Sequence, residues 1–167
     1  SKNCSTESLV DAGINEVWKA FTTKEGTKLW MAPLVEIDFA IGGKIRSNYN
    51  PNGKIGDATT IENTILSFDP KRMISLRPTK FPVGFPFVEA AKKQWTVFYF
   101  QEISSTRTKV TLVGLGYTDD EQSRKLREFF YCRQQIFDRQ AESGLGEKVI
   151  PARLECPLRF WAVISAL

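Results

Sequence analysis

The sequence predicts an α+β fold in which a curved antiparallel sheet packs against a long helix towards the C-terminus. Near the N-terminus, the apolar residues Ile14, Val17, Trp18 and Phe21 have the spacing of one face of a helix. Later segments alternate apolar and polar residues with a period of two, which is typical of strands with one buried face. A long segment after residue 118 is apolar on one side, so the helix that it predicts needs a surface to cover.

The composition is that of one ordinary globular domain. The 167 residues are 42% hydrophobic and 25% charged, and a chain of this size buries a core without metal or disulfide support. The 23 Lys and Arg residues are mixed with 19 Asp and Glu residues, so the net charge of +4 predicts no nucleic-acid interface. The C-terminal apolar run "FWAVISAL" is too short to span a membrane. We expect a cytoplasmic protein, with export after removal of a signal as the alternative.

The sequence contains no histidine, so any enzymatic mechanism has to use other acids and bases. Cys4, Cys132 and Cys156 are far apart and form no Cys-x-x-Cys pair. Reduced thiols, or one disulfide after export, are both compatible with this pattern. Glu36 and Asp38 are close in sequence but have no third acid nearby. We therefore expect no metal site and no cofactor.

The stretch "VEIDFAIGGKIR" at 35–46 contains a pair of glycines that invites two interpretations. A phosphate loop of the dinucleotide type needs a third glycine and a following helix, because the helix N-terminus supplies the anion site. Here the glycines are followed by the strand-like segment "KIRSNYN". The pattern therefore predicts a hairpin corner or a bulge between two strands.

Turn residues at 69–72 and 104–107 join later strands into an antiparallel meander. These strands are predicted at 58–68, 72–77, 94–103 and 107–115. The segment 78–93 is rich in Pro, Gly and Phe, and it is expected to form neither helix nor central strand. Thr118 and Glu121 have the spacing of a capping box. They predict the start of the long helix, which we expect to run to about residue 141.

Several segments in order carry a family resemblance: "EVWKAFTTKEGTKLWMAP" (16–33), "VEIDFAIGGKIR" (35–46), "TILSFDPKRMISL" (64–76), "WTVFYF" (95–100) and "TKVTLVGLGY" (108–117). The chain resembles the START-like (SRPBCC) superfamily over about residues 5–130. Within it, the chain resembles bacterial homologues of the C-terminal domain of the activator of the ninety-kilodalton heat-shock-protein ATPase. The resemblance implies a helix-grip fold, with two short helices after the first strand and a sheet that wraps the last helix around a cavity. It also implies one domain over 1–142 and an atypical extension over 143–167.

The resemblance does not choose among the ligand binders, cyclases and co-chaperone domains of the superfamily. The leading hypothesis is a non-enzymatic module that binds a small hydrophobic ligand, lipid-like or aromatic, between the sheet and the C-terminal helix, because such sites are concave and mostly apolar. The expected wall residues are Tyr49, Met73, Trp95, Val97, Tyr99, Leu112, Leu126, Phe129 and Phe130, with Arg77 as a polar anchor for a carboxylate or hydroxyl. Phe81, Phe85 and Phe87 are expected to form a lid over the mouth. Each of these side chains could equally fill a dry core.

Two other functions stay open at this point. The first is a cyclase-like or hydratase-like enzyme that uses Glu62, Tyr49, Tyr99 or Arg77; a carboxylate base would then need a pKa raised by burial. Glu62 would lose this role if it faced solvent. The second is a chaperone partner, which follows from the family name alone and ranks last. The extension over 143–167 could fold back onto the domain, mediate dimerisation or be unrelated to it.

Overall fold

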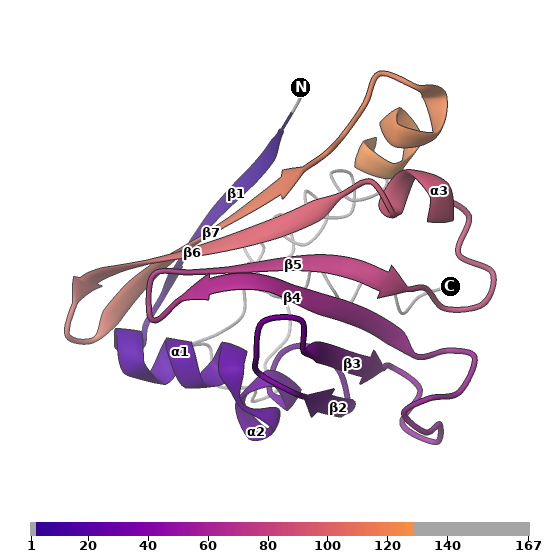
Figure 1. The fold of residues 1–167 in the computed structure, drawn as a ribbon. Coiled ribbons are helices and arrows are strands. Elements are labelled where there is room, and N and C mark those ends of the chain that lie inside the picture. Colours follow the sequence, from indigo (N-terminus) through magenta and orange to yellow (C-terminus); the bar gives the residue numbers. More distant parts are fainter. Residues whose placement is uncertain (1–2, 129–167) are drawn as a thin grey trace, which may run out of the picture.

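The computed structural model describes residues 3–128 of the chain, and it confirms the predicted α+β fold. One seven-stranded antiparallel sheet has the order β1-β7-β6-β5-β4-β3-β2 (Figure 1). The elements are β1 (Cys4–Val10), α1 (Ile14–Thr22), α2 (Lys24–Lys28), β2 (Leu34–Ile37), β3 (Lys44–Asn48), β4 (Ile61–Asp69), β5 (Met73–Lys80), α3 (Val88–Ala91), β6 (Trp95–Ser104) and β7 (Arg107–Leu115). Residues 121–128 are also helical. The predicted extension and the end of the long helix lie outside the described residues.

One face of the sheet, here called the inner face, is turned towards α1. Residues directly opposite each other on neighbouring strands share a face, and Phe98 lies opposite both Ile74 and Leu112. Phe21 of α1 packs on this face, with its ring centroid 5.1 Å from that of Phe98 and 4.9 Å from that of Phe100. The apolar stripe predicted for the first helix therefore covers the inner face at this end of the sheet.

The other end of the inner face carries a second hydrophobic cluster. Leu126, from the helical residues 121–128, packs with Tyr117 and with Ala90 and Ala91 of α3. The helical segment that follows β7 lies next to α3 (Figure 1). Cys4 packs against the same cluster and lies opposite Gly114 on β7, two residues from Leu112. Helices therefore cover the inner face at both of its ends.

The glycine pair forms the corner between β2 and β3, as predicted. Gly42 has a φ of 80°, a left-handed conformation that glycine adopts without steric cost. The Gly42 amide donates to the carbonyl of Ile65 on β4, and the Ile65 amide donates back to Gly43. The corner is thus fastened to the neighbouring strand, and no helix follows it.

The prediction that 78–93 contains neither helix nor central strand is wrong at both ends. Central strand β5 continues through Pro78 to Lys80, and α3 forms from Val88 to Ala91. Pro78 is tolerated because the register shifts beside it, between Glu62 and Asn63 of β4, and a proline lacks the amide hydrogen that a regular ladder needs.

The start of the last helix also differs from the prediction. The side chain of Asp120, rather than that of Thr118, accepts the hydrogen bond from the backbone amide of Ser123. The Ser123 hydroxyl in turn accepts a hydrogen bond from the Thr118 amide, at 2.9 Å. The helix start is therefore capped by Asp120, two residues later than predicted, because a carboxylate is a strong acceptor at this position, and the second bond of the pair comes from the amide of Thr118 and not from that of Asp120.

Candidate functional site

The predicted wall residues are divided between the two faces of the sheet. Val97 and Tyr99 are the neighbours of the inner-face residue Phe98 on β6, so their side chains point to the other face. Met73 lies opposite Tyr99, and Ser75 lies opposite Val97, so they share that face. They belong to the opposite face, here called the outer face. Tyr99 is 47% exposed there, whereas Val97 is buried. Trp95 is on the same face as Val97, two residues before it on β6. The prediction that Met73, Trp95, Val97 and Tyr99 line one wall together with Leu112 is therefore wrong.

Arg77 also belongs to the outer face. Its guanidinium carbon lies 5.8 Å from the ring centroid of Trp95, a geometry in which the cation is attracted to the face of the ring. Arg77 lies opposite Thr64 on β4, whereas its neighbour Leu76, on the inner face, lies opposite Ile65. Arg77 and Thr64 therefore share the outer face. Arg77 is therefore not placed to anchor a ligand on the inner face.

Three of the predicted residues lie at the inner face or pack with its clusters. Leu112 and Leu126 are fully buried, and Tyr49 is half-buried against the cluster beneath α1. Burial raises the pKa of the Tyr49 phenol well above its usual range. The predicted wall residues Phe129 and Phe130 lie outside the described residues.

The three predicted lid residues pack together beside α3. The rings of Phe81 and Phe85 are stacked, with their centroids 5.5 Å apart, and Phe87 meets Phe85 edge-on at 6.1 Å. Phe85 is buried within the cluster around Leu126. This packing accounts for the apolar character of the segment, and a role as a lid stays a prediction.

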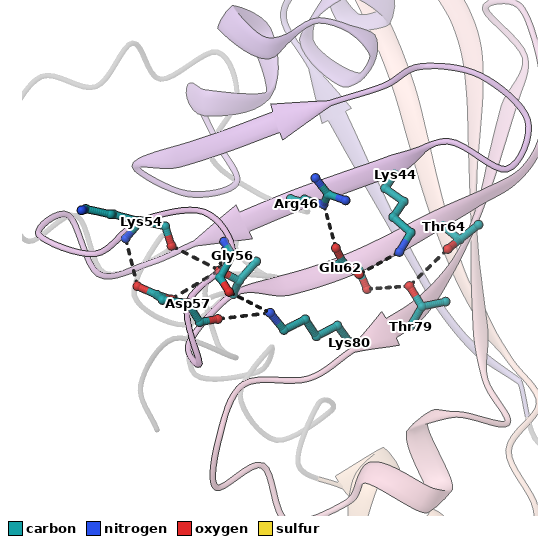
Figure 2. A network of polar contacts seen from close by, with 10 residues as sticks. Lys44, Arg46, Lys54, Gly56, Asp57, Glu62, Thr64, Thr79 and Lys80 are labelled. Atoms are coloured by element: carbon teal, nitrogen blue, oxygen red, sulfur yellow. Dashed lines mark hydrogen bonds and ion pairs between the residues drawn. The ribbon is translucent and has the colours of Figure 1, made fainter.

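Glu62 faces outwards and is held by two cations. Its carboxylate accepts hydrogen bonds from Lys44 Nζ at 2.9 Å and from Arg46 Nε at 2.7 Å (Figure 2). The hydrogen bond from Lys44, more than that from Arg46, lowers the pKa of the Glu62 carboxyl. A general base that works near neutrality needs the opposite shift. Glu62 therefore lacks both the position and the pKa that the enzyme hypothesis requires.

We expect Glu62→Gln to lower the free energy of unfolding by about 1 kcal/mol at pH 7, because both cations are partly solvated and screened. Because the folded-state pKa of Glu62 is lowered, its contribution is present above the unfolded pKa of about 4.3. It is lost as the pH falls through the folded-state value. Urea unfolding at pH 7 and pH 3 measures this loss, with Glu102→Gln, a change at an exposed residue of β6, as the control. Equal losses at both pH values would contradict the assigned ion pairs.

Next to this cluster, a second polar network fixes the loop between β3 and β4. Asp57 accepts hydrogen bonds from the amides of Lys54 and Thr59, and Lys80 Nζ donates to the carbonyls of Gly56 and Asp57 (Figure 2). The Lys54 amide, followed by the Thr59 hydroxyl, lowers the pKa of Asp57 to about 2. These bonds satisfy the polar groups of the loop internally, so its role is structural.

Sequence reasoning missed three buried polar side chains. Ser47 and Asn63 are fully buried, and the Ser47 Oγ and both side-chain polar atoms of Asn63 have no hydrogen-bond partner. The Nε2 atom of Gln94, just before β6, is also buried without a partner. The signal was present in "IENTI" (61–65), where strand alternation places Asn63 on the same face as Ile61 and Ile65.

The chain over residues 3–128 holds no group of three or more His, Cys, Asp or Glu side chains that could bind a metal ion. None of its helices is long and apolar enough to cross a membrane. Cys4 is a free thiol with a pKa raised by burial, and Cys132 and Cys156 lie outside the described residues.

The family model described as "Activator of Hsp90 ATPase homolog 1-like protein" matches residues 11–139. The chain belongs to this family. Among curated proteins, no sequence matches the chain significantly. The resemblance inferred from the sequence segments is thereby confirmed at the level of the family.

Solved structures of low sequence identity have the same fold. The Aha1 dimer of Colwellia psychrerythraea has a TM-score of 0.58 and 14% identity, and the match covers 87% of this chain and all of that one. A protein of Mesorhizobium loti has a TM-score of 0.56 and 16% identity, and the match covers 87% of this chain and all of that one. Norcoclaurine synthase of Thalictrum flavum, in complex with dopamine and hydroxybenzaldehyde, has a TM-score of 0.55 and 7% identity, with 87% of this chain and 89% of that one covered. At these identities the likeness establishes the helix-grip fold alone.

Proposed function

We propose that the protein binds a small hydrophobic molecule between the inner face of the sheet and the C-terminal helix, without catalysing a reaction. The observation that carries this proposal is the apolar inner face, on which the described residues form one cluster beneath α1 and another around Leu126. A bound molecule would lie on this face, between the two clusters.

Two further observations support binding rather than catalysis. Glu62, the strongest candidate for a general base, faces outwards in an ion-pair cluster with a lowered pKa. The inner face is lined mainly by aliphatic and aromatic residues such as Ile65, Leu76 and Phe98, which is the usual lining of a small-molecule site. The structure of norcoclaurine synthase with two aromatic molecules illustrates that this fold can hold such ligands.

The proposal is tested by titrating the purified full chain with N-phenyl-1-naphthylamine, a neutral apolar probe that fluoresces when it leaves water. We expect saturable binding with one site per chain. Leu112→Trp fills the inner face and should weaken binding about tenfold or more, whereas Val113→Trp places the same ring on the outer face and should leave it unchanged. Both variants are first checked for cooperative unfolding, because overpacking costs about 1–3 kcal/mol.

Native mass spectrometry of the untreated protein gives an independent measurement. An excess mass that disappears on denaturation would identify an endogenous ligand and would also report the oligomeric state. The proposed function is rejected if the probe fails to saturate or if Leu112→Trp and Val113→Trp reduce its affinity equally.

A further inference from the structure

We propose that Asn63 and Ser47 form a polar anchor on the inner face that selects ligands with an uncharged hydrogen-bonding group, such as a carboxamide or a hydroxyl. The inference rests on the proposed function and specifies the class of ligand. Neither residue belongs to the wall, the anchor or the lid that the sequence predicts.

The side chains of Asn63 and Ser47 are polar groups of the inner face that are buried without compensating hydrogen bonds. Both residues have 0% exposure, and the Oδ1 and Nδ2 atoms of Asn63 and the Oγ atom of Ser47 have no hydrogen-bond partner. Most buried side-chain polar atoms in proteins have at least one partner, and an unsatisfied group carries its full desolvation penalty. The buried side-chain amide of Asn63, with neither polar atom bonded, therefore requires an explanation. A ligand that supplies the missing hydrogen bonds would provide it.

The register places the two side chains close together. Asn63 lies opposite Ile45, and Ser47 lies opposite Ile61, on the adjacent strands β3 and β4. The two residues are therefore diagonal neighbours on one face, with Cα atoms roughly 7–8 Å apart. At this spacing one small ligand group could contact both side chains, which do not bond to each other.

The surroundings of the anchor exclude a charged ligand group. Among residues 3–128, no Lys, Arg, Asp or Glu is buried beside Asn63 and Ser47, and the half-buried Arg127 acts on Cys4 and Tyr117 of the cluster around Leu126. Burying an unpaired charge costs far more than burying a hydrogen-bonded neutral group. Asn63 offers two N–H donors and one carbonyl acceptor, which match a carboxamide or a hydroxyl that both donates and accepts.

The experiment compares three probes with the same ring system and different polar groups: 2-naphthamide, 2-naphthoate and naphthalene. Dissociation constants are measured by isothermal titration calorimetry on the full chain at pH 7. We expect 2-naphthamide to bind at least about tenfold more tightly than either of the others, because one satisfied buried hydrogen bond is worth about that factor. Asn63→Leu keeps the side-chain size and should abolish this preference while naphthalene binding is retained.

The matched control is Thr64→Val, one residue further along β4. Thr64 is on the outer face, where its hydroxyl shares a hydrogen bond with Thr79 (Figure 2). This variant should leave all three affinities unchanged. Ser47→Ala should reduce the preference for 2-naphthamide without affecting naphthalene.

The outcomes separate the anchor from the proposed function. Tight binding of 2-naphthamide that depends on Asn63 supports both. If all three probes bind with similar affinities, or if Asn63→Leu leaves the preference intact, the anchor is rejected and hydrophobic binding stands; ordered water would then satisfy these groups. If neither these probes nor N-phenyl-1-naphthylamine binds the wild-type chain, the proposed function itself is rejected, and the anchor with it.

Discussion

Replacing Phe98 with alanine is expected to lower the free energy of unfolding by about 3–5 kcal/mol, as large-to-small changes of buried aromatic residues do. Phe98 has 0% exposure. It lies at the centre of the inner face, opposite Ile74 and Leu112 and beneath the ring of Phe21. The change would leave a cavity between the sheet and α1 that neighbouring rigid strands cannot fill. Urea unfolding followed by far-ultraviolet circular dichroism measures the loss.

The control for this prediction is the next residue along the same strand. Tyr99 points to the outer face and is 47% exposed, so Tyr99→Ala should cost about 1 kcal/mol or less. Equal losses for the two variants would contradict the assignment of the two faces. That assignment also decides which of the predicted wall residues can meet a ligand.

The strands and their faces show how far the sequence determines this fold. The alternation in "WTVFYFQEI" (95–103) predicts strand β6, because strands place successive side chains on opposite faces. Both faces of this segment are apolar near its start, however, with Trp95 and Val97 on one and Phe98 and Phe100 on the other. Alternation alone therefore could not indicate which set faces the helices. The prediction mixed the two sets for this reason.

The position of Phe98 becomes clear only from contacts between distant segments. α1, more than seventy residues earlier in the chain, selects the inner face through Phe21. The outward position of Glu62 likewise depends on Lys44 and Arg46 of the adjacent strand. Asn63 could have been singled out, since it is the polar member of the apolar set Ile61, Asn63 and Ile65. The sequence could not show that the Asn63 side chain lacks a hydrogen-bond partner, because its possible partners come from every neighbouring strand.

The second large effect is expected at Gly116, where alanine should cost about 3 kcal/mol or more. Gly116 has a φ of 83°, a conformation that costs a residue with a Cβ atom about 1–2 kcal/mol. In addition, a Cβ atom at this position would lie 2.3 Å from the backbone carbonyl oxygen of Lys93 and 3.0 Å from the ring of Trp95. The backbone carbonyl cannot move aside as a flexible side chain can, so the strand end itself would have to shift.

Gly42→Ala is the matched control for this prediction, because Gly42 has nearly the same φ of 80° but no atom within 4 Å of the added Cβ. It should cost only the conformational penalty of about 1–2 kcal/mol. The difference between the two variants in urea unfolding therefore isolates the contact between Gly116 and the start of β6. A difference near zero would contradict that contact.

The contact at Gly116 also bears on ligand binding. Gly116 precedes Tyr117, which packs with Leu126 from the helical residues 121–128. Gly116 also lies against Gln94, whose side-chain Nε2 has no partner. A shift at this point would move the helical segment relative to the inner face. We therefore expect Gly116→Ala to weaken binding of N-phenyl-1-naphthylamine in protein that is still folded, whereas Gly42→Ala should leave it unchanged. Unchanged binding in folded Gly116→Ala would instead place the ligand nearer to α1 than to this end of the sheet.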